Sequence, residues 1–281
     1  MLKKAYLEIT NICNASCNFC PGTQREKRML TKDEFITLAS RLREHTDYLY
    51  FHLMGEPLVH PLIGEFLDIA GEMGFRVIIT TNGMLLGKNG DAILGKKALH
   101  KVNISLHSFE GGNARGLLGE YLADCAGFAK KCAESGTIIS YRLWNLDGED
   151  TVGANGENAF IKDFLAAFHG DWQENARGVR LADKIFLGYG EKFIWPDMQG
   201  ENYGETGFCY GLRDQVGVLC DGTVVPYCLD HEGDIPLGNL FDSALDEVLN
   251  SPAAREITDG FSQRRKVHEL CQKCGYARRF S

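Results

Sequence analysis

The sequence predicts an α/β protein, with a partial (β/α)6 TIM-like barrel followed by a small C-terminal domain of a β-hairpin and helices. Two observations predict it. Apolar strand-like segments alternate with amphipathic helix-like segments through the first two-thirds of the chain, which implies a parallel sheet with right-handed crossovers. From about Gly207 the pattern changes to short strands, turns and several cysteines. We therefore expect two domains, residues 1–200 and residues 201–281.

The alternation contains six strand-like segments, whereas a closed barrel of this type has eight, so we expect an arc that is open on one side. An open arc suits a large substrate. In such folds the active residues lie at the C-terminal ends of the strands. The predicted strands are residues 5–10, 48–53, 75–81, 101–106, 138–143 and, less clearly, 184–189.

Amphipathic segments between these strands are expected to form helices. Thr31 begins the first of them and Glu34 follows three residues later, which is the pattern of a capping box. Residues 147–158 are rich in Gly, Asp and Asn, and they predict a loop. The other predicted helices are residues 62–73, 121–134 and 160–168.

Composition excludes several classes of protein. The net charge of −8, without a convincing run of Lys or Arg, argues against a nucleic-acid partner. The start of the chain lacks the apolar core of a signal peptide, and no apolar run approaches the roughly 20 residues that span a bilayer. We therefore predict a cytoplasmic protein without a membrane partner. Ten cysteines in a reducing cytoplasm indicate metal ligands and not disulfides.

Cys13, Cys17 and Cys20 form a CxxxCxxC pattern directly after the first predicted strand. One short loop can place three such thiolates around a single iron–sulfur cluster, which leaves one iron of a [4Fe–4S] cube without a protein ligand. Ferredoxin-type clusters are held by four cysteines and only carry electrons. A cube with an open iron can instead bind a substrate or cofactor. A zinc site or redox-active thiols are the alternatives, and structural zinc prefers paired CxxC units.

A second group of cysteines lies in the C-terminal region. Residues 217–226 predict a β-hairpin with an Asp-Gly turn, and residues 242–249 predict a helix. Cys220 lies beside the turn and is interpreted as a packed thiol. The whole group is compatible with a zinc site of four cysteine ligands. Its members are Cys209, Cys220, Cys228, Cys271 and Cys274.

The loop from Cys13 to Cys20 resembles the signature of the radical S-adenosylmethionine (radical SAM) superfamily. The resemblance implies that the methionine moiety of SAM chelates the open iron. Injection of an electron then yields a 5′-deoxyadenosyl radical, which abstracts hydrogen from the substrate. Phe19 stands at a position that is usually aromatic in the family, beside the adenine.

The segment after the second predicted strand resembles the GGEP motif of that family, with Met54 in place of the first glycine. The resemblance implies that Gly55, Glu56 and Pro57 help to bind the cofactor. In the family this backbone bonds the amino group of the methionine moiety, and Glu56 can balance the ammonium charge. An ordinary strand-to-helix turn is the alternative interpretation.

The next three predicted strands also end in residues that resemble those of the family. The implied roles of Asn82, Ser105 and His107 are hydrogen bonds to the ribose and carboxylate of the cofactor. Arg142 and Asn145 lie near the same rim after the fifth strand. Arg142 could pair with the cofactor carboxylate, and a structural salt bridge is an equally good interpretation.

The C-terminal cysteines resemble the Twitch module, a shortened form of the SPASM domain. The resemblance implies that Cys209, Cys228, Cys271 and Cys274 hold one auxiliary [4Fe–4S] cluster, which carries an electron or shapes the substrate pocket. The C-terminal domain is then expected to close the open side of the barrel. Residues 191–197 are expected to line the substrate pocket or to pack between the domains.

These features together predict a radical SAM enzyme that oxidises a small molecule by two electrons, as a dehydrogenase does. The start of the first strand near residue 5 predicts that no N-terminal peptide-recognition domain is fused to the chain. A peptide- or protein-modifying maturase is the alternative, and a flavodoxin or ferredoxin is the expected reductant. The alternatives of another class are a non-catalytic iron–sulfur electron carrier and a zinc-binding module. The sequence predicts no catalytic acid or base.

Overall fold

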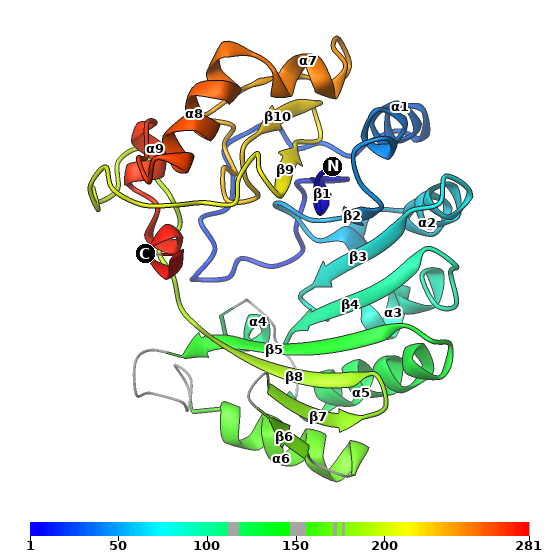
Figure 1. Ribbon diagram of the computed structural model, residues 1–281. Coiled ribbons are helices and arrows are strands. Elements are labelled where there is room, and N and C mark those ends of the chain that lie inside the picture. The colour runs from blue at the N-terminus through cyan, green and yellow to red at the C-terminus, as the bar shows by residue number, and fades with distance from the viewer. Residues whose placement is uncertain (112–117, 147–155, 171–172, 176–177, 281) are drawn as a thin grey trace.

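A computed structural model describes residues 1–281 except 112–117, 147–155, 171–172, 176–177 and 281 (Figure 1). Its centre is one sheet of eleven strands, in the order β11-β10-β9-β1-β2-β3-β4-β5-β8-β7-β6. Six of these strands pair in parallel in chain order, which confirms the predicted partial (β/α)6 barrel. They are β1 (Lys4–Leu7), β2 (Tyr48–Tyr50), β3 (Arg76–Thr81), β4 (Leu99–Ser105), β5 (Ile138–Leu146) and β8 (Ile185–Glu191).

Helices connect these strands and lie along the outer side of the arc (Figure 1). The first helix, α1 (Lys32–Arg43), begins at the predicted capping box, in which the Thr31 and Glu34 side chains each accept from the backbone N–H of the other residue. Its apolar stripe is buried against the sheet, as the sequence periodicity predicts. The other helices of this half are α2 (Ile63–Glu72), α3 (Leu86–Asn89), α4 (His107–Gly111), α5 (Leu118–Glu134) and α6 (Asn158–His169), with 3-10 turns η1 (Pro57–Val59) and η2 (Gly90–Ala92).

The two faces of the parallel strands differ in polarity. Ala5 and Leu7 of β1 are fully buried in the core beneath the helices, whereas Lys4 and Tyr6 point to the opposite face. The same alternation recurs on β2 and β4. On β1, β2 and β4 the inner face of the arc therefore carries polar side chains.

The C-terminal region extends the same sheet beyond β1. Strand β9 (Gln215–Val218) pairs in parallel with β1 and forms the predicted hairpin with β10 (Thr223–Val225). Because one sheet runs through the whole chain, the division at residue 200 stays a prediction. The remaining elements here are β11 (Gly238–Asn239), α7 (Leu245–Leu249), α8 (Pro252–Ser262), α9 (Glu269–Gln272) and η3 (Gly275–Phe280).

An antiparallel pair, β6 (Gln173–Asn175) and β7 (Gly178–Ala182), precedes β8 and forms the other edge of the sheet. These two strands were not predicted from the sequence. Most of the loop predicted at 147–158 lies outside the described residues. In the described part of the chain, no helix is both long and apolar enough to cross a bilayer.

Candidate active site

The three N-terminal cysteines lie on the long loop that follows β1. Cys13 and Cys20 are exposed and Cys17 is half-buried. A turn brings the last two together through a hydrogen bond from the Cys20 N–H to the Cys17 carbonyl, 3.1 Å long. Burial, followed by the neighbouring Cys13 and Cys20 thiols, raises the pKa of Cys17 to about 11. Three soft thiol ligands on one accessible loop fit an iron–sulfur cluster.

A buried carboxylate fixes the start of this loop. Glu8 has no exposed side-chain surface and accepts two hydrogen bonds from the Arg25 guanidinium, at 2.7 and 2.9 Å. It also accepts from the backbone N–H groups of Met54, at 3.1 Å, and Cys220, at 3.0 Å. One side chain therefore connects the cysteine loop, the end of β2 and the C-terminal hairpin.

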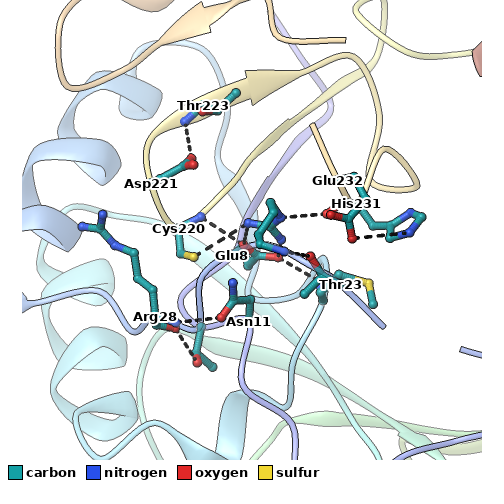
Figure 2. A network of polar contacts seen from close by, with 12 residues as sticks. Glu8, Asn11, Thr23, Arg28, Cys220, Asp221, Thr223, His231 and Glu232 are labelled. Atoms are coloured by element: carbon teal, nitrogen blue, oxygen red, sulfur yellow. Dashed lines mark hydrogen bonds and ion pairs between the residues drawn. The ribbon is translucent and has the colours of Figure 1, made fainter. Parts of the chain in front are cut away.

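The same loop contacts the C-terminal region further along. Figure 2 shows Glu8 between Cys220 and the loop that carries Thr23 and Arg28. Arg25 donates from Nε to the His231 carbonyl at 2.8 Å, and the Gln24 N–H donates to Glu232 Oε1 at 3.0 Å. The cysteine loop is thus held against the region that carries the second cysteine group.

Gly55 and Glu56 join the ends of neighbouring strands. Gly55 has a φ of +76°, and a Cβ there would lie 2.4 Å from the Thr10 carbonyl oxygen. The buried Glu56 carboxylate accepts from the backbone N–H groups of Leu58, at 3.0 Å, and Asn82, at 2.7 Å. Burial raises its pKa to about 7. Both oxygens of the Glu56 carboxylate thus accept hydrogen bonds from the protein backbone. Pro57 is the first residue of η1.

Asn82 lies beside the cysteine loop. Its side-chain amide donates to Asn14 Oδ1 at 2.9 Å and lies 3.9 Å from the Cys13 sulfur. Its backbone carbonyl accepts from the Tyr121 hydroxyl at 2.8 Å. The structure therefore brings the end of β3 to the first cysteine.

Phe19 and His107 pack together across the site. Their ring centroids are 5.0 Å apart, and Phe19 is 38% exposed. His107 Nδ1 lies 3.1 Å from the Arg142 carbonyl, and burial lowers the pKa of His107 to about 4, so the ring is neutral at pH 7. Half-buried Ser105 lies opposite Arg142 in the sheet register.

Asn145 and Arg142 have different surroundings, although both were predicted on the same rim. The Asn145 amide donates to Glu110 at 2.9 Å and exchanges hydrogen bonds with Asn158. The Asn145 side chain therefore bonds to helices α4 and α6 on the helical side of the sheet. The Arg142 guanidinium stacks over Trp144, 4.4 Å from the ring centroid. Burial lowers the pKa of Arg142 to about 10.

A set of inner-face residues was not predicted from the sequence. They stand at every second position of their strands, beside apolar residues that face the helices. Period-two polarity within otherwise apolar parallel strands is the signal that could have found them. The set consists of Lys4 and Tyr6 on β1, Tyr50 and His52 on and after β2, and Lys101 and Asn103 on β4.

The C-terminal cysteines surround a mostly apolar cavity. Cys209, Cys271 and Cys274 line it together with side chains such as Leu229 and Phe261. Cys228 follows Pro226 and Tyr227 of the cavity wall, and its pKa is raised to about 11 by burial. Burial, together with the nearby Cys274 and Cys228 thiols, raises the pKa of Cys209 to about 12. This donor set fits an iron–sulfur cluster.

The C-terminal segment reaches the far edge of the parallel strands. Arg279 donates to the Glu191 carbonyl at the end of β8, at 2.8 Å. The Tyr276 ring packs on Phe193, with centroids 5.1 Å apart, and Trp195 packs on His231 at 5.7 Å. Residues 191–197 therefore pack against the C-terminal region, which is one of the two roles expected for them.

Two family models match this chain, and each match includes one of the two cysteine groups. Residues 7–149 match the model of the Radical SAM superfamily, and residues 209–275 match that of an iron-sulfur cluster-binding domain, SPASM. The first match covers 143 of 281 residues, which is more than half of the chain.

Curated relatives have several different names. A tungsten-containing aldehyde ferredoxin oxidoreductase cofactor-modifying protein of Pyrococcus furiosus is 35% identical over 92 residues, covering 30% of this chain and 25% of the relative. A probable GTP 3′,8-cyclase of Saccharolobus islandicus is 31% identical over 111 residues, covering 38% and 35%. The antilisterial bacteriocin subtilosin biosynthesis protein AlbA of Bacillus subtilis is 22% identical, covering 97% and 65%. The chain thus spans less than two thirds of each of these relatives.

Solved structures share the fold. BtrN in complex with AdoMet and 2-DOIA aligns with a TM-score of 0.63 and 19% identity, covering 98% of this chain and 93% of BtrN. Streptococcus suis SuiB aligns with a TM-score of 0.64 and 14% identity, covering 99% and 74%. At these identities the likeness concerns the fold alone.

Proposed function

This chain belongs to the radical SAM superfamily, and from that premise we propose that it oxidises a small polar molecule by two electrons. Membership implies a [4Fe–4S] cluster and SAM, and the SPASM match implies auxiliary iron–sulfur chemistry. When bound, the cluster and SAM supply a 5′-deoxyadenosyl radical that abstracts hydrogen from a substrate. The protein's own residues position these groups.

We propose that Cys13, Cys17 and Cys20 hold the SAM-binding cluster. Their place on one accessible loop at the C-terminal end of β1 supports this assignment. Phe19 belongs to this loop and Asn82 contacts it, while Gly55 and Glu56 fix the strand ends beneath it. The proposed cofactor rim consists of Phe19, Gly55, Glu56, Pro57, Asn82, Ser105, His107 and Arg142. The internal hydrogen bonds of Asn145 give no support to a direct contact with the cofactor.

We propose that Cys209, Cys228, Cys271 and Cys274 hold one auxiliary cluster, which supplies an electron acceptor. The observation that carries the proposed function is the placement of the two cysteine groups. Glu8 and Arg25 fasten the first group to the hairpin of the second, and Cys228 of the second group packs against the cluster that contains Tyr6 of the polar inner face. An electron acceptor near that face suits net oxidation of a substrate.

A peptide-modifying activity is the second candidate. The fold likeness to SuiB, one of whose structures is described as bound to precursor peptide SuiA, favours it, as does the match to AlbA over 97% of this chain. The two candidates differ in substrate class and share the same cofactors. A flavodoxin or ferredoxin is the proposed reductant for either.

Formation of 5′-deoxyadenosine tests the proposed function. Anaerobically reconstituted protein with dithionite and SAM should form it, and a Cys13/Cys17/Cys20→Ala triple variant should not. Cys132→Ala is the control, because Cys132 is a buried thiol of α5 that belongs to neither cysteine group, and it should retain the activity. Intact SAM in the presence of reduced clusters would contradict an enzyme and favour an electron carrier.

A further inference from the structure

We propose that the side-chain ammonium of Lys266 balances part of the negative charge of the auxiliary cluster and raises its reduction potential. This inference rests on the proposed function, because it concerns the cluster assigned above to Cys209, Cys228, Cys271 and Cys274. A higher reduction potential makes the cluster a better electron acceptor, which is the role that the proposed oxidation requires. The place of Lys266 in the fold, its lack of an acidic partner and the charge of the cluster support it in turn.

Lys266 lies in the wall of the mostly apolar cavity that contains the auxiliary cysteines. Three of the proposed cluster ligands line this cavity with it, namely Cys209, Cys271 and Cys274. Only 3% of the Lys266 surface is exposed, although a lysine is almost never fully buried unless it is paired. A buried cation that shares one apolar cavity with three cluster ligands is the observation that carries this inference.

Two segments that carry auxiliary cysteines hold Lys266 in place. A Cβ on Gly207 would lie 3.2 Å from Lys266 Cε and 3.3 Å from its Cδ, so the lysine stem packs on the backbone two residues before Cys209. The side-chain amide of Gln272, the residue after Cys271, donates to the Lys266 carbonyl at 3.0 Å. Lys266 is therefore held between the segment of Cys209 and the segment of Cys271.

Within the described ranges of the chain, Lys266 forms no ion pair. The Asp230 carboxylate lines the same cavity, but it accepts hydrogen bonds from two backbone N–H groups, at 2.8 and 2.9 Å. Lys273, which lies between two auxiliary cysteines in the sequence, pairs with Glu269 at 2.7 Å, so its charge is already balanced. A buried ammonium without a counter-charge is costly, and an anion in the cavity removes that cost.

A second cavity, of about 530 Å³, also has Lys266 in its wall, together with polar side chains such as Asn202 and Thr206. Lys266 therefore stands at the boundary between an apolar cavity and a polar one. A lysine in such a place buries its stem against apolar surface and keeps its charged end in polar surroundings. Burial lowers the pKa of Lys266, while the thiols of Cys274 and Cys271 oppose that shift. This boundary position favours a charged ammonium beside the auxiliary cysteines.

A cubane cluster held by four thiolates is an anion in both of its redox states, and reduction adds one more negative charge. A cation nearby therefore stabilises the reduced state more than the oxidised state. Because net charge is one of the factors that set the potentials of such clusters, a buried ammonium raises the potential. The apolar cavity strengthens this effect, since charges interact more strongly where the dielectric constant is low. The position of Lys266 thus predicts a cluster that is easier to reduce.

The test is an anaerobic redox titration of the reconstituted full chain, followed by electron paramagnetic resonance. The signal of the auxiliary cluster is the one that also appears in the Cys13/Cys17/Cys20→Ala variant. Lys266→Met removes the charge and keeps an unbranched side chain, and it should lower the midpoint potential of this signal. At the wild-type midpoint, the ratio of reduced to oxidised cluster should fall about tenfold, which corresponds to about 59 mV for one electron.

Matched variants separate the charge of Lys266 from its packing. Arg265→Met removes an equal charge from the neighbouring exposed residue and should change the ratio less than about twofold, because water and salt screen an exposed charge. Lys266→Arg keeps the charge and should restore most of the potential. A wild-type potential in Lys266→Met with its full iron content overturns the inference, as does an equal shift in Arg265→Met.

Iron content covers the case in which a variant does not assemble the cluster. Lys266→Gln is then compared with Lys266→Met, because both side chains are neutral and only glutamine is polar. Loss of the auxiliary iron from both neutral variants, with a wild-type potential in Lys266→Arg, supports the role of the charge. Loss of the auxiliary iron from all three variants overturns the inference, because it shows that Lys266 contributes packing and not charge.

The same samples separate this inference from the proposed function. Each is assayed for 5′-deoxyadenosine after addition of dithionite and SAM. SAM cleavage together with an unchanged potential in Lys266→Met overturns the inference and leaves the proposed function standing. A potential that depends on Lys266 without SAM cleavage overturns the proposed function and leaves the inference standing. Zinc in place of iron at the C-terminal cysteines overturns the inference and removes the proposed electron acceptor.

Discussion

Glu8 explains how a long irregular loop keeps one position. A buried carboxylate without partners is very costly, yet the carboxylate of Glu8 is satisfied by Arg25 and by two backbone N–H groups. Its four contacts come from segments that are far apart in the sequence. We therefore interpret Glu8 as a positioning residue for the cysteine loop and not as a catalytic acid.

Glu8→Gln should destabilise the protein by about 3 kcal/mol or more, because it leaves the largely buried Arg25 guanidinium without its counter-charge. The measurement is the midpoint of thermal unfolding, together with the iron content of the reconstituted protein. Arg180→Gln breaks an exposed ion pair with Asp183, and it should cost less than about 1 kcal/mol. Equal midpoints for the two variants would contradict the role assigned to Glu8.

His169 should make stability depend on pH. Its Nε2 lies 3.0 Å from the Tyr141 hydroxyl, and burial lowers its pKa from the ordinary value of 6.5 to about 4. The unfolded chain then binds more protons than the folded chain between these values, so the free energy of unfolding falls as the pH falls through that window.

His169→Gln should lose this component. The unfolding midpoints of both proteins are compared at about pH 7.5, above that window, and at about pH 5, inside its lower half. The wild type should lose more stability than the variant on acidification. An identical loss in the two proteins would show that His169 is protonated equally in the folded and unfolded states.

At the level of elements, the close approach of the β1 and β2 ends depends on Gly55. A Cβ there would contact the Thr10 carbonyl oxygen at 2.4 Å, so Gly55→Ala must separate the two ends. Gly95→Ala is a matched control, since Gly95 has a φ of +69° and open space around it. We expect Gly95→Ala to form 5′-deoxyadenosine and Gly55→Ala to lose it with its cluster iron. Equal activities would mean that the loop tolerates the displacement.

Local sequence patterns predicted many of these elements. The capping box at Thr31 and the six apolar strands depend on neighbouring residues, and the structure contains them. The pairing of β9 with β1 joins segments more than 200 residues apart, and no local pattern specifies it. Asn145 was predicted on the rim, but it bonds to Asn158 of α6, a partner that becomes visible only when the helices pack.

At the scale of the whole molecule, the sequence predicted the two groups of cysteine ligands, whereas the polar inner face of the arc was not predicted. The spacing of Cys13, Cys17 and Cys20 is a local signal, whereas Ser105 and Arg142 become neighbours only through the sheet. The alternation of polar residues on β1, β2 and β4 contained part of that information. The fold converts this alternation into one inner face, and Cys228 of the second cysteine group packs beside Tyr6 of that face.

Counting the iron bound by each cysteine group tests the central claim of two cluster sites most directly. Anaerobically reconstituted wild type should hold about eight irons per chain, because two cubane clusters contain four irons each. The Cys13/Cys17/Cys20→Ala and Cys209/Cys228/Cys271/Cys274→Ala variants should each hold about four, and only the second should still cleave SAM. A wild type with about four irons or fewer, or with zinc in the C-terminal group, would contradict the claim and remove the proposed electron acceptor.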